Sequence, residues 1–110
     1  MKKGFLFTIQ TDNFNKIRNY SVEHKIPIQK LLNFLISKYY KDYILKLKTQ
    51  KITNIPKNNL AKCYFKIDKA NYHKLRTISY RYNISMSQQI NDMINLYLNS
   101  NTINEILPII

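Results

Sequence analysis

Lysine and arginine are the side chains with the clearest chemical consequence in this chain. Eighteen of them stand against six aspartates and glutamates, which gives a formal net charge of +12 at pH 7. Such an excess repels itself in a compact protein and is typical of a protein with a polyanionic partner. We expect nucleic acid to be that partner, and an anionic membrane surface is the second candidate. A bias toward A/T-rich codons would explain the many lysines, but it would not explain the shortage of glutamate.

No residues are spaced as a catalytic or metal-binding set. The acids are scattered, no histidine stands beside a candidate nucleophile, and there is no Gly-rich phosphate loop. His24, Cys63 and His73 are far apart in sequence. We therefore expect no enzyme activity, no metal and no cofactor. Cys63 is the single cysteine, so an internal disulfide is impossible and a small core residue is expected.

The sequence also bears on where the protein acts. No apolar run approaches the ~20 residues of a membrane span, and the segment after Met1 is too short for a signal peptide. We expect the protein to remain in the cytoplasm, with no membrane partner. The many residues with A/T-rich codons favour an A/T-rich genome, such as that of a virus or a plasmid. In the viral case the location is the host cytoplasm.

The sequence that must form the elements carrying these lysines contains an internal repeat. When the chain is shifted by 58 positions, residues 7–40 align with 65–98 without a gap, and 10 of the 34 pairs are identical. In the first copy the identical residues are Phe7, Ile9, Asn13, Lys16, Arg18, Ser21, Ile26, Asn33, Ile36 and Tyr39. A unit of about 40 residues is too small to bury a core alone. We expect the copies to pack together as one compact domain with internal pseudo-twofold symmetry.

Each copy opens with a short strand. Residues 5–10 are rich in aromatic and β-branched side chains, and residues 62–68 alternate with a period of two. The residues expected to point inward are Phe5, Phe7, Ile9, Cys63, Phe65 and Ile67. Neither strand has another partner in the sequence, so we predict that 5–10 pairs with 62–67 in antiparallel fashion.

A helix follows each strand and ends at a short break. The first is expected over 13–25 with Thr11 or Asp12 as its cap, and Asp68 is expected to cap its counterpart. The breaks fall at 25–27 and 83–85. The residues that suit them are Asn83 as a left-handed C-cap and Pro27 in the first turn of a new helix.

A second helix follows each break. In copy one its apolar stripe contains Ile28, Leu31, Leu32, Leu35, Ile36, Tyr39 and Tyr43, and in copy two Met86, Ile90, Met93, Ile94, Tyr97 and Leu98. Ser85 or Ser87 can cap the second of these helices. The expected organisation is a unit 1–45, a basic connector 46–60 with a continuing helix at its start, a unit 61–100 and an apolar tail 101–110.

This order of a strand, a helix, a break and a longer helix resembles the ribbon-helix-helix family of DNA-binding proteins (the MetJ, Arc and CopG type). The resemblance covers both copies, about three quarters of the chain. It implies a mainly α fold with a two-stranded antiparallel β-ribbon, built as a tandem pseudo-dimer that inserts its ribbon into the major groove of DNA. The family often has glycine at the turn between its helices, where this chain has Lys25 and Asn83.

The resemblance also implies two sets of DNA contacts. The ribbon positions that would meet base edges are Leu6, Thr8, Gln10, Lys62, Tyr64 and Lys66. Lysine can donate to guanine, glutamine can pair with adenine, and Leu6 or the Thr8 methyl can touch a thymine methyl. The N-terminus of each second helix would hold a DNA phosphate, at Ile28, Gln29, Lys30, Ser85, Ser87 and Gln88. An ordinary solvated strand face and plain helix capping are the structural alternatives.

The function expected from these features is sequence-specific binding of double-stranded DNA by a transcriptional repressor that acts by occlusion. A plasmid-transfer accessory protein or an antitoxin would use the same DNA module. A basic module that coats RNA or a membrane surface belongs to a different class. One chain is expected to act as a monomeric intramolecular pseudo-dimer, with self-association on DNA through Ile106–Ile110 as a further option.

Overall fold

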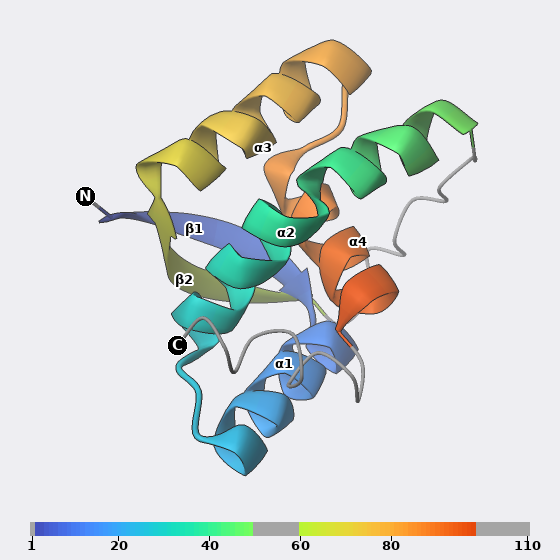
Figure 1. Cartoon of the computed structure of the whole chain (residues 1–110). Helices are drawn as coiled ribbons and strands as arrows, with labels where there is room; N and C mark the ends of the chain where they lie inside the picture. Colours follow the sequence, from blue (N-terminus) through green and yellow to red (C-terminus); the bar gives the residue numbers. More distant parts are fainter. Residues whose placement is uncertain (1, 50–59, 99–110) are drawn as a thin grey trace.

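The computed structural model describes residues 2–49 and 60–98, which form four helices and a two-stranded antiparallel sheet (Figure 1). Their order is β1 (Lys2–Gln10), α1 (Thr11–His24), α2 (Ile28–Thr49), β2 (Leu60–Asp68), α3 (Lys69–Tyr82) and α4 (Met86–Tyr97). The expected mainly α fold with a β-ribbon is confirmed. Residues 50–59 of the expected basic connector, which include Lys51 and Lys57, and the expected tail 101–110 lie outside the described residues.

The two strands pair along their whole length. Phe5 lies opposite Phe65 and Leu6 opposite Tyr64, as the predicted antiparallel pairing requires. Because residue 64 is 58 positions beyond residue 6, the pairing matches corresponding positions of the two copies at this point. The predicted inward residues Phe7, Ile9, Cys63, Phe65 and Ile67 are buried, and Phe5 is partly buried with its ring stacked on that of Tyr72.

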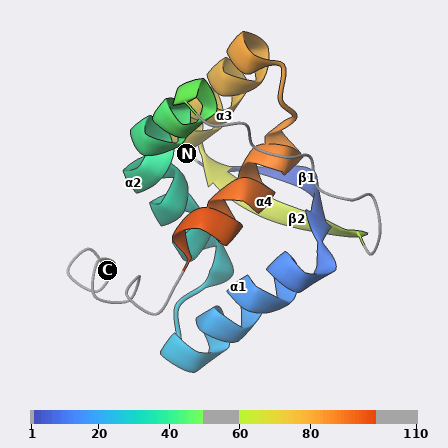
Figure 2. The ribbon, with the colours of Figure 1, turned by 90° about the vertical axis from the view of Figure 1, so that its right-hand side faces the viewer.

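Helices α2 and α4 cover one face of the ribbon, while α1 and α3 lie on opposite sides of it (Figures 1 and 2). The copies interlock, since α2 packs against β2 and α3, whereas α4 packs against β1 and α1. The core residues on α2 and α4 include Leu31, Leu32, Leu35, Ile36, Ile90, Met93 and Ile94, all fully buried. Neither copy therefore encloses its own core, in keeping with its small size.

Both helix–helix breaks contain a residue with left-handed backbone conformation. These residues are Lys25, with a φ of 55°, and Asn83, with a φ of 56°. Asparagine adopts this conformation readily because its short polar side chain can form local hydrogen bonds, whereas the side chain of lysine does not support it in this way. At the first break the backbone N–H of Ile26 donates to the carbonyl of Ser21 at 3.0 Å, which stabilises the end of α1. The breaks predicted at these positions are confirmed.

The helix starts differ in part from the prediction. Gln10 occupies the N-cap position of α1, so the prediction of Thr11 or Asp12 as the cap is wrong. Pairing of Gln10 with Leu60 keeps β1 extended up to the first helical residue, which leaves no separate capping residue. Asp68 is at the N-cap position of α3 but makes no side-chain capping bond. Ser85 caps α4 as predicted, since its Oγ accepts the backbone N–H of Gln88 at 3.0 Å.

The second helix of copy one is longer than the boundary at residue 45 implied. α2 continues to Thr49, so Lys46 and Lys48 lie on a helix and only part of the expected connector 46–60 separates α2 from β2. The Thr49 hydroxyl donates to the Leu45 carbonyl at 2.9 Å within the last helical turn. The continuing helix that was expected at the start of this stretch is therefore present.

Asn33 of α2 joins three elements through its side-chain amide. Its Nδ2 donates to the backbone carbonyl of Lys66 at 3.1 Å, and its Oδ1 accepts the backbone N–H of Asp68 at 2.9 Å. The same Oδ1 accepts from Nδ2 of Asn71 at 3.0 Å. Asn33 and Asn71 are both buried. The amide thus fixes α2 to the end of β2 and to the start of α3.

Asn91 of α4 makes the corresponding bonds at the other end of the ribbon. Its Nδ2 donates to the carbonyl of Thr8 at 3.2 Å, and its Oδ1 accepts the backbone N–H of Gln10 at 2.9 Å. Nδ2 of Asn13 also donates to this oxygen at 2.9 Å. Every residue in this set is 58 positions from its counterpart around Asn33. The two networks therefore attach each helix to the strand of the other copy.

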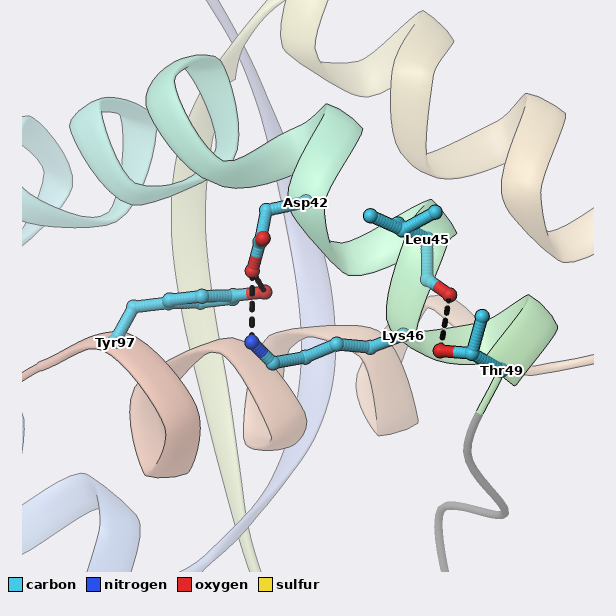
Figure 3. A network of polar contacts seen from close by, with 5 residues as sticks. All are labelled: Asp42, Leu45, Lys46, Thr49 and Tyr97. Atoms are coloured by element: carbon cyan, nitrogen blue, oxygen red, sulfur yellow. Dashed lines mark hydrogen bonds and ion pairs between the residues drawn. The ribbon is translucent and has the colours of Figure 1, made fainter.

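A second polar cluster joins the C-terminal half of α2 to α4 (Figure 3). The Tyr97 hydroxyl donates to Asp42 at 2.5 Å, and the Lys46 ammonium lies 2.8 Å from the same carboxylate oxygen. The Lys46 hydrogen bond, with that of Tyr97, lowers the pKa of Asp42, while burial raises the pKa of Tyr97. The ring of Tyr39 stacks on that of Tyr97 with centroids 4.2 Å apart.

Asp92 is a buried carboxylate that is held by neutral groups. The Tyr43 hydroxyl donates to its Oδ2 at 2.6 Å, and Nε2 of Gln88 donates to its Oδ1 at 2.8 Å. Burial raises the pKa of Asp92, and these two hydrogen bonds offset part of the effect. The carboxyl therefore keeps its proton at a higher pH in the folded protein than in the unfolded chain.

Replacing Asn91 by alanine should destabilise the fold strongly. The change leaves the Thr8 carbonyl and the Gln10 N–H without their side-chain partner, so we expect a loss of about 2–4 kcal/mol in the free energy of unfolding. Asn95→Ala is the matched control, because Asn95 is on the same helix and exposed. Urea unfolding monitored by circular dichroism measures both variants. Equal stability of the two variants would contradict a structural role for the Asn91 amide.

Asp92→Asn should change how stability depends on pH. The pKa of Asp92 is raised in the folded protein, so the contribution of its protonated carboxyl to the free energy of unfolding is fully present below the unfolded pKa near 3.8. That contribution is lost as pH rises through the folded pKa. The variant lacks this loss, so its stability relative to the wild-type protein should rise with pH across that window. Tyr43→Phe removes a bond to the charged form and should extend the window upward. Parallel pH profiles of unfolding free energy for wild-type and Asp92→Asn protein would rule the effect out.

Candidate nucleic-acid interface

The outer face of the ribbon is the side of the sheet that α2 and α4 leave uncovered (Figure 2). At its centre the cross-strand pair Leu6 and Tyr64 is 64% exposed at each residue. Lys62 and Lys66 are exposed on either side of Tyr64, opposite Thr8 and Gly4 respectively. The alternation predicted for this strand is therefore present, and both lysines project away from the core.

Thr8 and Gln10 are half-buried at the edge of the same face. The backbone N–H of Thr8 donates to the hydroxyl of Ser87 at 3.0 Å, which ties β1 to the first turn of α4. The side-chain oxygen of Gln10 accepts from Nδ2 of Asn13 at 3.4 Å. The side-chain oxygen of Gln10 is therefore directed toward α1, which limits its use in contact with a base edge.

The N-terminus of α2 has the features of an anion site. Ile28, Gln29 and Lys30 form its first turn, where backbone N–H groups have no acceptor within the helix. Lys30 is exposed, Gln29 is half-buried, and Ile28 is packed against the core. The position of this turn relative to the ribbon follows from Asn33, one turn further on, which is bonded to the end of β2.

At the N-terminus of α4, the side chains of the first turn take part in more hydrogen bonds within the protein than those of α2 do. Ser87 accepts the Thr8 N–H, and the Gln88 side chain donates to buried Asp92. Ser85 uses its hydroxyl to cap the helix and remains exposed. Of the three residues proposed for phosphate contact here, Ser87 and Gln88 thus contribute to the internal structure with their side chains. The Ser87 bond had no signal in the sequence, because Thr8 is 79 residues away, whereas Gln88 and Asp92 are an i, i+4 pair on one helix that the sequence could have indicated.

Positive charge continues beyond the ribbon. The exposed side of α3 carries a shallow depression lined by His73, Arg76, Thr77, Tyr80 and Arg81. Near the end of α2, Lys48 is exposed, whereas Lys46 is paired with Asp42. Lys48 is therefore more available to a polyanion than Lys46. Cys63 is buried on β2, and burial raises the pKa of its thiol, as expected of a core cysteine.

Sequence reasoning missed two residues of the outer face. Gly4 lies opposite Lys66 and extends the face beyond Leu6, and Leu60 lies opposite Gln10 and is 41% exposed. The period of two in β1 would have identified Gly4 if the strand had been started at residue 2 rather than residue 5. Identity of Asn13 with Asn71 and of Asn33 with Asn91 was visible in the repeat, and it marked the residues that hold this face in place.

Comparison of the chain with protein-family models, with characterised proteins and with solved structures found no match. Within residues 2–49 and 60–98, no three histidine, cysteine, aspartate or glutamate side chains are grouped as a metal site. No helix in the same part of the chain is long and apolar enough to cross a membrane.

Proposed function

We propose that this protein binds double-stranded DNA in a sequence-specific manner by inserting the outer face of its ribbon into the major groove. The observation that carries the proposal is the uncovered face of a two-stranded antiparallel sheet with exposed Lys62 and Lys66. A ribbon of two strands has the width that the major groove accepts. The net charge of +12 supplies attraction to the phosphate backbone.

The two asparagine networks support a tandem ribbon-helix-helix pseudo-dimer. Each network attaches a second helix of one copy to the strand of the other, and the bonds recur at a spacing of 58 residues. In this interpretation the fused copies replace the two subunits of a homodimer. One chain then holds a complete ribbon, and it acts as a transcriptional repressor that occludes its site.

The proposed division of labour follows from the side chains. Lys62 and Lys66 donate to guanine O6 and N7, while Leu6 and the Thr8 methyl contact thymine methyl groups. The outer face carries Tyr64 between its two lysines. Gln10 has the weakest case for base contact, because its side-chain oxygen is engaged with Asn13.

Phosphate contacts would fix the protein on the duplex without reading its sequence. The first turn of α2 offers backbone N–H groups and the exposed ammonium of Lys30. At α4 the exposed residue is Ser85, whereas Ser87 and Gln88 would contribute through their backbone. Two such turns would hold phosphates beside the ribbon.

Substitution of the ribbon lysines should separate base readout from general attraction. Lys62→Ala and Lys66→Ala are each expected to weaken binding to the selected site by ~1–3 kcal/mol and to relax base preference. Lys48→Ala is the matched control and should weaken binding to all duplexes alike while it reduces the salt dependence. Affinities for a selected and a scrambled duplex at several salt concentrations provide the measurement.

Two results would reject this function. If the ribbon lysines behaved like Lys48, base readout by the ribbon would have to be abandoned. If RNA or anionic vesicles competed as well as the selected duplex at equal charge, the protein would be a general polyanion binder.

The DNA subsite of one chain should be asymmetric. Leu6, Thr8 and Gln10 on β1 differ from Lys62, Tyr64 and Lys66 on β2, so one half should prefer guanine and the other should prefer A·T pairs. Binding-site selection from random DNA tests this, and recovery of a palindromic subsite by single chains would argue against it. The same selection with a chain truncated after Ser100 tests whether Ile106–Ile110 supports paired occupancy, which should then be lost.

A further inference from the structure

Gly4 is the only glycine in the chain. It lies inside β1, where glycine weakens a strand because it has no side chain to pack and loses more conformational freedom than other residues. No glycine in the described residues has a positive φ, so backbone conformation does not require glycine here. The remaining reason for glycine in a strand is the close approach of another group.

That group is the side chain of Tyr64 on the neighbouring strand. A Cβ atom placed on Gly4 would lie 1.8 Å from Oη of Tyr64, 2.0 Å from its Cζ and 2.5 Å from one ring Cε. Real Cβ contacts are never this short, so the tip of the phenol ring occupies the space that any other residue would fill. Gly4 is opposite Lys66, two residues along β2 from Tyr64. The ring therefore lies diagonally across the ribbon, over β1.

We infer that Gly4 is a specificity-determining position, because its lack of a side chain lets Tyr64 lie across the ribbon with its hydroxyl at the Gly4–Lys66 pair. This inference rests on the proposed function, since it assigns Tyr64 a fixed orientation in the major groove. The phenol is 64% exposed as a residue, so it remains accessible to DNA while its tip rests on β1. Its hydroxyl is both a donor and an acceptor, and it lies at Gly4, whose partner across the ribbon is Lys66, a residue proposed to contact guanine.

The packing of an aromatic ring over a glycine occurs at one end of the ribbon only. The residue 58 positions after Gly4 is Lys62, and the one 58 positions before Tyr64 is Leu6. The corresponding diagonal therefore joins Leu6 and Lys62, which offers neither an open backbone nor an aromatic ring. Gly4 and Tyr64 thus add to the difference between the two groove-facing halves.

The free protein gives a direct test of the contact between Gly4 and the Tyr64 ring. Because Gly4 is the only glycine, its Hα resonances can be assigned without ambiguity, and nuclear Overhauser contacts to the Tyr64 ring protons are expected. Gly4→Ala should displace the ring and abolish the contacts to residue 4, with little loss of stability because the tip of an exposed side chain can move. Absence of those contacts in the wild-type protein would overturn the inference.

The DNA-bound state tests the consequence through a double-mutant comparison. Binding-site selection with Gly4→Ala should alter base preference about tenfold at the positions facing the Gly4–Lys66 end, as expected for loss of one base contact. Affinity for scrambled duplex should stay within about twofold. In the Tyr64→Ala background, adding Gly4→Ala should change nothing further, since no ring remains to be displaced.

The remaining outcomes distinguish the inference from the proposed function. An effect of Gly4→Ala that persists without Tyr64 would show that residue 4 meets DNA itself and would reject the positioning role. Unchanged base preference in Gly4→Ala would also reject it. If wild-type protein selects no sequence at all, the proposed function fails together with the reading role of Tyr64. If the wild-type protein does select a sequence, Tyr64→Phe separates the contribution of the ring from that of the hydroxyl. Loss of base preference in this variant would assign base recognition to the hydroxyl.

Discussion

The structure depends on two buried asparagine amides that hold the strands to the helices. A two-stranded sheet is marginal in water and needs a covering layer, which α2 and α4 provide. Apolar packing alone would allow those helices to slide along the strands. Asn33 and Asn91 prevent this, because each amide donates to one backbone group of a strand and accepts from another two residues on. Aspartate lacks the donor and leucine lacks both, so neither could make these bonds.

This constraint also fixes the candidate interface. The amides bond at Thr8 and Gln10 and at Lys66 and Asp68, which are outward-facing positions of the two strands. The side chains of these four strand residues therefore project from backbone that is anchored at both ends of the ribbon. The same helices begin less than two turns before each asparagine, so their N-terminal turns are placed relative to the ribbon by the same bonds. Readout and phosphate contact would then share one rigid support, as a precise site requires.

Much of this arrangement could be predicted from the sequence because it follows from local periodicity and from the repeat. The strands and the buried stripes of α2 and α4 follow from the spacing of apolar residues, and the breaks follow from Asn83 and Pro27. The failures have a common physical cause. Thr11 and Asp12 satisfy the local rule for a cap, but the pairing of Gln10 with Leu60 decides where the helix starts. Ser87 bonds to Thr8, which is 79 residues away, and no local pattern encodes such a bond.

The two copies agree where the fold demands it and differ where DNA contact is proposed. Asn13 and Asn33 recur as Asn71 and Asn91, and the inward Phe7 and Ile9 recur as Phe65 and Ile67. In contrast, every outward position of β1 from residue 4 to residue 10 differs from its counterpart, as does every residue from 27 to 30 at the start of α2. Packing constrains the first group in both copies alike, whereas the residues of the second group are all at least partly exposed, so packing constrains them less. In a homodimer such divergence is impossible, because one gene specifies both halves. In the proposed tandem pseudo-dimer, fusion would remove that limit, and covalent linkage would keep the two different halves in equal number and in fixed register. Such a ribbon would present two unlike halves of one face to DNA on a common scaffold.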